Sequence, residues 1–442
     1  MSKFSTFSGT INFIPLKYNL KLRHIHVKNF RSFNDAKIDL KNLNFLIGAN
    51  SSGKSNLINV LAFLRDIVKC SLDDAVSMQG GIEYLRNMEI GASNDILIKA
   101  IFTKEPVCFV ASRYGDNTVS RCVPDEITYS LKIGFGKSKL DYFVKEEILD
   151  GSFRLQKSEG PKKIWKDFYN GRMVLERDQK GSIKSHLPEN LPVSFETIVP
   201  MFNLIFEKSH LNVEKHTSFL GIALFSPLFG SMYDYFSSIK IYSIDPHMSK
   251  QPSLITGKKE LEPDGSNLAV VLKNLLSDRK KRETFLTIIK ELLPFINKTT
   301  VTTLQDRSLL LLQHEENVDK PLPSILVSDG TINIIATIVA LFFSEGTLII
   351  IEEPERNIHP SLISQLVELF KDVTGRMGRQ VIVTTHNPLF VRNVSVENLM
   401  LLSRNEKGYS SISIPADQKE VREFLKNQIG IDELFIQNLL GE

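Results

Sequence analysis

A glycine-rich turn at residues 48–55, with the sequence Gly-Ala-Asn-Ser-Ser-Gly-Lys-Ser, constrains the fold more than any other feature of this chain. It follows a short apolar run, Asn44–Ile47. After it, apolar residues recur at helical spacing, at Leu57, Ile58, Leu61, Leu64, Ile67 and Val68. A strand, a turn of the form G-x-x-x-x-G-K-[ST] and a helix in this order predict a phosphate-binding loop. A chance glycine turn does not account for both flanking elements.

The residue types in this turn suit an anion. Gly48 and Gly53 let the backbone approach phosphate oxygens closely, and the N–H groups at a helix start present partial positive charge. Lys54 adds a full charge near the β- and γ-phosphates, and the Ser55 hydroxyl is placed to ligate Mg²⁺. Kinases, GTPases and ATPases all use such a loop, so a second site has to separate them.

Two adjacent carboxylates, Glu352 and Glu353, follow the apolar strand Thr347–Ile351. Because side chains alternate along a strand, one carboxylate can hold Mg²⁺ while the other polarises an attacking water. The alternative is a pair of solvated carboxylates at a strand exit. The apolar run before them and Pro354 after Glu353 weaken that alternative.

A further strand, Arg379–Thr384, leads into Thr385 and His386. Ligands of open α/β sheets bind beyond the carboxyl ends of parallel strands, so His386 is a candidate for contact with a γ-phosphate. The segment Val327–Thr331 opens a long apolar helix, and by itself it is an ordinary helix N-cap. Its position, 24 residues before Glu352, gives it more weight.

Along the chain we expect three parts. Residues 1–150 form an N-terminal lobe with the phosphate loop, 151–238 a mostly helical insertion, and 239–442 a C-terminal lobe. Short alternating runs within 22–47 predict strands of one mixed or antiparallel sheet. Alternating helices and strands over 329–384 predict a parallel α/β core.

The net charge is +3, from 54 Lys and Arg against 51 Asp and Glu, which excludes a nucleic-acid binder that is basic overall. Locally, residues 151–187 hold nine Lys and Arg against four Asp and Glu, interleaved with aromatic residues. This pattern suits a nucleic-acid contact, which charge reversal at Lys162, Lys163 and Lys166 tests. A solvated insertion loop with a small aromatic cluster fits it as well. The basic run 278–282 is likewise either an exposed helix start or a DNA contact.

Three cysteines without metal-ligand spacing, Cys70, Cys108 and Cys122, argue against a disulfide framework and for a reducing compartment. We see no secretory signal at the N-terminus. The apolar stretches 218–233 and 332–351 are both interrupted, so we expect no membrane helix and a cytoplasmic protein.

Taken together, these motifs resemble ABC-type ATPases of the SMC/RecF/OLD class. The resemblance covers roughly residues 22–135 and 240–405. Within this class, the chain is similar to stand-alone bacterial AAA-family ATPases of anti-phage type, such as the PARIS, Septu and retron-associated ATPases. The residues that carry it are Val27–Phe33, Gly48–Ser55, Leu261–Leu268, Ser328–Thr331, Glu352–Glu355, His359-Pro360 and Thr385-His386.

The resemblance implies an α/β fold: an ABC-type P-loop NTPase head, with a mixed sheet, flanking helices and a compact insertion between the Walker A and signature motifs. Such heads dimerise head-to-tail around ATP and Mg²⁺. Glu352 corresponds to the Walker B carboxylate on the metal, together with Ser55. Glu353 corresponds to the catalytic glutamate, His386 to the switch histidine, and Pro354–His359 to the D-loop. The implied ATP-binding residues are Asn50, Ser51, Ser52, Gly53, Lys54, Ser55 and Asn56 of one subunit and Ser328 and Gly330 of its partner.

Three departures from the family pattern stand out. The signature reads Ser-Asp-Gly-Thr, and the Walker B carboxylate is Glu rather than Asp. The glutamine that contacts magnesium in this family is not obvious, and Gln79 is a weak candidate for it.

We therefore expect an ATP-hydrolysing switch that forms a homodimer or higher homo-oligomer and controls a separate effector, a nuclease or a toxin, in anti-phage defence. The 56 residues after His386 are too few for a typical TOPRIM nuclease domain. Open alternatives are a RecF-type DNA-repair ATPase and a scaffold joined by ATP with little turnover. A transporter ATPase subunit is disfavoured by the RecF-like start and the large insertion.

Overall fold

Two stretches of sequence combine in each of the two units into which the chain divides. The first unit takes in the described residues up to Leu40 and then Asn59–Ser237, and the second takes in Lys41–Ile58 and Ser238–Glu442. The computed structural model describes residues 20–103, 109–112, 119–138, 140–159, 164–186, 188, 190, 213–220, 227–255, 257–316, 318–427, 430–437 and 439–440.

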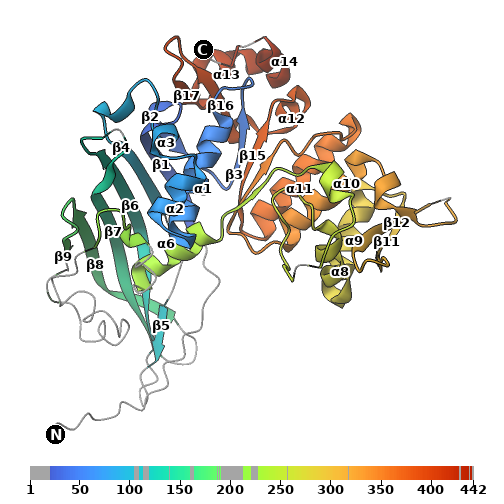
Figure 1. Ribbon diagram of the computed structural model, residues 1–442, viewed down its shortest axis with the longest axis horizontal. Helices are drawn as coiled ribbons and strands as arrows, with labels where there is room; N and C mark the ends of the chain where they lie inside the picture. The colour runs from blue at the N-terminus through green and yellow to red at the C-terminus, as the bar shows by residue number, and fades with distance from the viewer. Residues whose placement is uncertain are drawn as a thin grey trace, which may run out of the picture. The chain divides into compact units, whose positions relative to one another are not determined.

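One antiparallel sheet makes up most of the first unit (Figure 1). Its strand order is β2-β1-β4-β6-β7-β8-β9, and β5 pairs with β6. The strands are β1 (Lys21–Phe30), β2 (Phe33–Asp39), β4 (Ile96–Thr103), β5 (Phe109–Ser112), β6 (Val119–Phe135), β7 (Tyr142–Glu159), β8 (Ile164–Asp178) and β9 (Ile183–His186).

Strand β4 shows why this sheet has one covered face. Its residues alternate strictly between buried and half-exposed, as expected for a sheet covered on one side. Helix α6 (Pro227–Ser237) packs on that face, where the ring of Phe102 meets Tyr235 and Phe236 edge-on at centroid distances of 5.1 and 5.3 Å. The other helices of this unit are α2 (Leu72–Met78), α3 (Ile82–Leu85) and η1 (Gly91–Ser93).

The segment predicted as a mostly helical insertion, residues 151–238, begins with β-strands instead, because β7 continues to Glu159 and is followed by β8 and β9. The first nine residues of β8 include no buried side chain, so this strand lacks the alternation that identifies a strand in a sequence. The described residues 213–220 contain no α-helix; their Phe219 N–H donates to the buried Glu147 carboxylate of β7 at 2.9 Å. Residues 191–212 and 221–226 lie outside the described residues, and the end of the segment, Pro227–Ser237, is the helix α6.

A six-stranded sheet forms the centre of the second unit, in the order β10-β14-β15-β3-β16-β17. Every neighbouring pair is parallel except β16 and β17, which confirms the predicted parallel α/β core. The strands are β3 (Leu43–Ile47), β10 (Lys240–Tyr242), β14 (Leu348–Glu352), β15 (Gln380–Thr385), β16 (Leu399–Arg404) and β17 (Ser410–Ser413). The three runs predicted to share one sheet within 22–47 therefore divide: β1 and β2 belong to the first unit and β3 to the second.

Strand β3 lies between β15 and β16, and all of its residues are buried. Because β14, β15 and β3 are parallel, their carboxyl ends meet at one edge of the sheet. The register pairs Thr385 with Ile47 and Glu352 with Thr384. The turn at 48–55, the paired carboxylates and His386 thus leave the sheet at the same edge.

Helices surround this sheet, and a small antiparallel sheet lies beside them (Figure 1). The small sheet consists of β11 (Ile296–Thr303), β12 (Leu309–Glu315) and β13 (Leu322–Pro323). The helical elements are α1 (Lys54–Lys69, continuing into the first unit), α7 (Pro246–Ser249), α8 (Leu268–Ser277), α9 (Arg279–Leu292), η3 (Ser324–Leu326), α10 (Asp329–Ile338), the π-helical η4 (Val339–Phe343), η5 (Pro360–Leu362), α11 (Ile363–Arg376), α12 (Pro388–Asn393), η6 (Val396–Asn398), η7 (Pro415–Asp417), α13 (Lys419–Lys426) and α14 (Ile431–Ile436).

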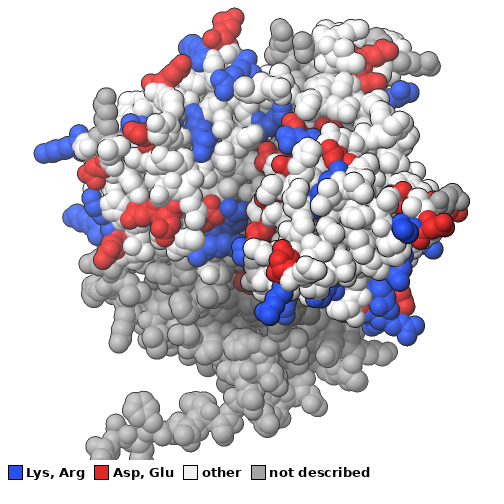
Figure 2. Space-filling view, turned by 45° about the vertical axis from the view of Figure 1, so that its right-hand side comes forward, with Lys and Arg blue, Asp and Glu red and all other residues white. Residues whose placement is uncertain are grey.

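The predicted amphipathic helix after the glycine-rich turn is α1, and its predicted apolar face is buried. The basic run 278–282 starts α9, with Asp278 as the N-cap. No helix in the described part of the chain has the length and hydropathy needed to cross a membrane. Charged side chains of both signs are interspersed on the face drawn in Figure 2.

Candidate functional site

The residues of the turn between β3 and α1 suit the backbone conformation that the turn adopts. Gly48 has φ +147° and Gly53 has φ +114°. A Cβ at Gly48 would lie 2.2 Å from the carbonyl oxygen of Leu402, so no side chain fits there. Ser51, with φ +66°, takes a left-handed conformation that costs a non-glycine residue free energy. The turn leads directly into the N-terminus of a 16-residue helix, which is the arrangement that binds phosphate.

Lys54 places an ammonium group inside this turn. Its Nζ donates to the carbonyls of Gly48 at 2.6 Å and Ala49 at 2.9 Å, and the residue is only 9% exposed. Burial lowers the pKa of Lys54, while the charges of Glu353 and Glu355 partly restore it. The ammonium therefore lies in place with backbone partners that it can exchange for a charged phosphate.

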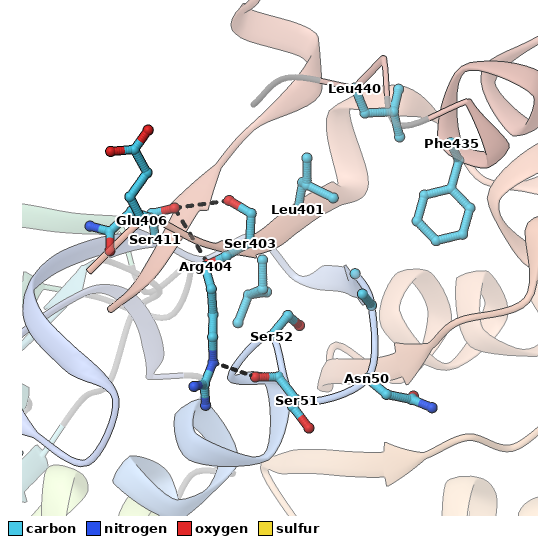
Figure 3. Close-up of a pocket in the computed structure, with 14 residues that line it drawn as sticks. Asn50, Ser51, Ser52, Leu401, Ser403, Arg404, Glu406, Ser411, Phe435 and Leu440 are labelled. Carbon is cyan, nitrogen blue, oxygen red and sulfur yellow. Dashed lines mark hydrogen bonds between the residues drawn. The ribbon is translucent and has the colours of Figure 1, made fainter. Parts of the chain in front are cut away.

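Two side chains from the C-terminal part of the chain hold the turn from outside. The Arg404 Nε–H donates to the Ser51 carbonyl at 2.6 Å (Figure 3). The Ser410 hydroxyl donates to the Ser52 carbonyl at 2.7 Å. Both come from the β16–β17 hairpin. The sequence analysis did not find them, since no local pattern relates residues some 350 positions apart.

A cavity of about 640 Å³ lies between this turn and β16 (Figure 3). Residues 48–52 form one side, and Leu401–Glu406 form much of the other. The Ser52 Oγ is buried there and has no hydrogen-bond partner among the described residues. Ser55, at the start of α1, is exposed, and the Asn56 N–H bonds back to the Gly53 carbonyl at 3.0 Å.

Glu352 and Glu353 have different surroundings at the end of β14, as predicted from the alternation of side chains. Burial and the neighbouring charge of Glu353 raise the pKa of Glu352, whose carboxylate has no hydrogen-bond or ion-pair partner in the described part of the chain. Glu353 has φ +45°, and its N–H donates to the Thr384 carbonyl at 3.0 Å. The two carboxylates can therefore serve different tasks.

The Glu353 carboxylate is held by an arginine and a histidine. Arg356 donates to Oε2 at 2.8 and 2.9 Å, and the His386 Nδ1 lies 3.0 Å from Oε1. Partial burial would raise the pKa of Glu353, but the hydrogen bonds and charges of Arg356 and His386 outweigh it and hold that pKa below its ordinary value. Glu353 is thus an ionised carboxylate next to an exposed imidazole, and its oxygens can accept a hydrogen bond from a water molecule.

A third carboxylate, Glu355, was noted in the sequence only as part of the motif. It is 7% exposed, and its Oε1 accepts a hydrogen bond from the Thr385 hydroxyl. Burial raises the pKa of Glu355, and the bond from Thr385 opposes that effect.

The predicted signature residues start α10 instead of joining the phosphate loop. Ser328 is the N-cap, its Oγ accepting from the Thr331 N–H at 3.1 Å, and it is exposed. Gly330 packs so closely on the turn after β14 that a Cβ there would lie 2.4 Å from the Asn357 carbonyl oxygen. Neither residue lines the cavity beside the phosphate loop of its own chain.

Asn333, on the same helix, holds the predicted D-loop from within. Its Nδ2 donates to the carbonyls of Pro354 at 3.0 Å and Arg356 at 2.7 Å. His359 ends this loop, and its Nδ1 accepts from the Ser361 N–H at 3.3 Å as the N-cap of η5. The sequence analysis did not identify Asn333, because an asparagine inside an apolar helix carries no motif.

The weak candidate Gln79 lies in the first unit, at the C-terminus of α2. Its Oε1 accepts from the Arg31 guanidinium at 2.6 Å. Since the side-chain oxygen is already used within that unit, nothing here supports Gln79 as a metal ligand.

Ion pairs neutralise part of the positive charge within residues 151–187. Arg154 pairs with Asp125 and Asp167, and Arg172 pairs with Asp150 at 2.6 Å. Lys162 and Lys163 lie outside the described residues, and Lys166 is exposed on β8. The nucleic-acid contact stays a prediction.

The residues at the sheet edge fit ATP with Mg²⁺. A helix N-terminus, a buried ammonium and the unpartnered Ser52 hydroxyl suit an anion. No cluster of three or more His, Cys, Asp or Glu side chains that could hold a metal ion occurs among the described residues. Mg²⁺ needs no such cluster when phosphate oxygens complete its shell, and Ser55 with Glu352 would supply the protein ligands.

Comparison with known proteins gives two partial likenesses. Over 46 residues the chain is 44% identical to the DNA replication and repair protein RecF of Lactococcus lactis subsp. cremoris strain MG1363, and identical to the same extent to that of strain SK11. The match spans 10% of this chain and 13% of the RecF chains.

Solved structures with partial likeness are SMC heads. The SMC head domain from Thermotoga maritima has a TM-score of 0.40 at 13% identity, over 89% of this chain and 98% of that one. The Smc head with an extended coiled coil, bound to the C-terminal domain of ScpA from Pyrococcus furiosus, has a TM-score of 0.43 at 11% identity, over 92% and 100%. No functional property follows from likenesses of this size.

A sequence-family model also matches the chain. The family described as "AAA domain, putative AbiEii toxin, Type IV TA system" matches residues 43–111 and 123–392, more than three quarters of the chain. The matched ranges contain the phosphate loop, the carboxylates after β14 and the turn with His386. The chain therefore belongs to this AAA-domain family.

Proposed function

We propose that this protein is an ATP-hydrolysing switch whose second units associate head-to-tail around ATP. The observation that carries the proposal is the division of the site. Lys54, Glu353 and His386 gather at one sheet edge, whereas the exposed Ser328 caps α10 and its hydroxyl bonds to Thr331 of the same helix. The signature residues complete a site only if a second copy supplies them.

Within that site each residue has a defined task. Lys54 exchanges its bonds to Gly48 and Ala49 for phosphate oxygens. Glu353, ionised by its bonds to Arg356 and His386, accepts a proton from the attacking water. Mg²⁺, when bound by Ser55 and Glu352, neutralises charge on the phosphates. Ser328 and Gly330 of the partner present a helix N-terminus to the γ-phosphate.

We propose further that the switch controls a separate effector, a nuclease or toxin, in bacterial anti-phage defence in the cytoplasm. The family description, which names a toxin–antitoxin system, supports a defence role without identifying the effector. Co-purification of the tagged protein from its own host, followed by mass spectrometry, would identify a bound effector.

Substitution of Lys54 tests the nucleotide site. Lys54→Ala removes the charge that opposes the phosphates, so we expect loss of ATP binding in a titration that measures Kd. Lys37→Ala, which changes an exposed lysine on β2, is the matched control and should bind as the wild type does. Unaltered ATP affinity in Lys54→Ala would refute the site.

Substitution of Glu353 separates a switch from an ATP-joined scaffold. Glu353→Gln removes the base, so turnover should fall about 100-fold or more while ATP still binds. For a switch, the variant accumulates as an ATP-bound dimer and its cellular output stops. A scaffold would keep both its assembly and its output in the same variant, and output is measured as protection of cells from phage.

A RecF-type role in DNA repair is the second candidate, favoured by the 46-residue match to RecF. Duplex DNA should then stimulate ATP turnover, with a response that weakens as salt is raised. Charge reversal at Lys166, compared with Lys37→Glu, tests whether β8 contributes. If DNA leaves turnover unchanged at low salt, this candidate fails.

A further inference from the structure

Glu355 is a buried carboxylate that the proposed ATPase site does not use. It is 7% exposed, and its Oε2 is buried without a hydrogen-bond partner among the described residues. A buried polar atom without a hydrogen-bond partner costs free energy. Because Oε2 is left without a partner at this cost, the role of the Glu355 side chain is to be sought in its other oxygen, Oε1.

That other oxygen bonds to the strand that carries the switch histidine. The Thr385 hydroxyl donates to Glu355 Oε1, and the same hydroxyl accepts from the Asn387 N–H at 3.0 Å. Thr385 is fully buried, so the hydroxyl has no exposed alternative. These hydrogen bonds fix Thr385 and Asn387, the residues on either side of His386 in the chain.

The turn that carries Glu355 is itself fixed. Asn333 of α10 holds the carbonyls on both sides of Glu355, those of Pro354 and Arg356. The Glu353 N–H is bonded to the Thr384 carbonyl at 3.0 Å. Glu355 therefore joins a rigid turn to the short segment that aims the His386 ring at Glu353.

We propose that Glu355, acting through Thr385, is a positioning residue that orients His386 against the catalytic Glu353. The inference rests on the proposed ATPase function. Glu355 is shielded and its accessible bond goes to Thr385, so it is not itself the base. Its role is to keep the imidazole within 3.0 Å of the Glu353 carboxylate while nucleotide binds and leaves.

Two pairs of variants test this positioning. Thr385→Val removes the hydroxyl at constant shape, and Thr385→Ser retains it. Glu355→Ala removes the acceptor, and Glu355→Gln retains an oxygen that accepts from Thr385. We expect Thr385→Val and Glu355→Ala to lower kcat about 10- to 100-fold with ATP Kd unchanged, because misplacement of a reacting group costs rate more than affinity. The conservative variants Thr385→Ser and Glu355→Gln should stay near wild-type kcat.

The separation of kcat from ATP Kd is a readout that a merely structural role would not give. If Thr385→Val and Glu355→Ala lost ATP affinity together with kcat, or if Thr385→Ser and Glu355→Gln lost as much kcat as they do, the proposal would be overturned.

A double-mutant cycle with His386→Ala decides whether the effect passes through the histidine. Without the imidazole, Thr385→Val should cost little further activity. Independent losses that multiply would contradict the proposal. The proposed role of His386 has its own test in the same experiment, because it fails if His386→Ala alone has wild-type turnover.

Discussion

At the scale of single residues, Glu353 combines an unusual backbone with two charged partners. Its φ of +45° is uncommon for a residue with a long side chain, and such conformations cluster at functional sites. The conformation turns the chain so that the carboxylate meets Arg356 and His386 at once. A glycine would adopt this backbone more easily but would have no carboxylate. The strained backbone at Glu353 therefore accompanies the need for a carboxylate at this position.

Because Glu355 is buried, we expect its replacement by glutamine to stabilise the protein by an amount that depends on pH. The pKa of Glu355 is raised in the folded protein, chiefly by burial, so the folded state holds its proton to higher pH than the unfolded chain does. Above that pKa the buried charge therefore destabilises the fold, and below the ordinary value of 4.5 the penalty disappears. Glu355→Gln should raise Tm at neutral pH, and the gain should vanish in acid.

Thermal melts of Glu355→Gln and wild type over a pH series measure this difference. Glu291→Gln, at an exposed position on α9, is the control, and its Tm difference from wild type should not depend on pH. A Tm difference for Glu355→Gln that is the same at all pH values would show that the pKa of Glu355 is the same in the folded and unfolded chains.

Much of the site was predictable residue by residue, because its motifs are local. The phosphate loop needs a strand, two glycines, a lysine and a helix within some 25 residues, and the carboxylates follow one apolar strand. Arg404, Ser410 and Asn333 were not predictable as parts of the site. Each acts through a hydrogen bond to backbone that only the folded topology brings near.

At the scale of secondary-structure elements, α10 and the turn after β14 behave as one body. Gly330 touches the Asn357 carbonyl, and Asn333 bonds to both carbonyls beside Glu355. In the proposed dimer, a displacement of α10 by the partner would therefore be passed to the turn that carries Glu353.

Substitution of Gly330 tests that contact. Gly330→Ala puts a Cβ 2.4 Å from a backbone oxygen, so the helix and the turn must separate. We expect a loss of about 1 to 3 kcal/mol in the free energy of unfolding, measured in denaturant, because overpacking of a close contact costs that much. Gly375→Ala on α11, where a Cβ meets nothing within 4 Å, is the matched control and should be neutral or stabilising.

Elements were predicted well where one face is buried and poorly where it is not. The helices and strands from α10 to β15 were found from their apolar periodicity. Strand β8 was not, since its first nine residues have no buried side chain and its register is set by pairing with β7. Pairing over such a long ribbon depends on backbone hydrogen bonds, which leave no trace in side-chain pattern.

At the scale of the whole molecule, the proposed head-to-tail dimer predicts complementation between two inactive variants. Lys54→Ala lacks the phosphate contact, and Ser328→Arg blocks the surface that faces a partner's nucleotide. In a mixed dimer, the intact Lys54 of one chain meets the intact Ser328 of the other and makes one complete site. A 1:1 mixture should therefore recover about one quarter of wild-type turnover, because half of the dimers are mixed and each has one working site.

ATP turnover of each variant alone and of the mixture measures this recovery. Mixing Lys54→Ala with Glu353→Gln is the control, because both changes fall in the same half of the site. Each mixed dimer then has one site without Lys54 and one without Glu353, so no complete site forms. Recovery in the control as large as in the test mixture would exclude a site shared between copies.

The place of β3 in its sheet has a consequence for synthesis on the ribosome. Both of its neighbours, β15 and β16, come late in the chain, and Ser410, which holds the turn, follows Ser52 by 358 residues. At ribosomal speeds that interval takes roughly 20 to 70 seconds, and for most of it β3 has no partner strand. A nascent chain at that stage has an incomplete phosphate-binding turn and an unpaired strand that is apolar apart from Asn44. The turn is completed only after Ser410 has been synthesised, and the need for a chaperone is greatest before β15 and β16 are made.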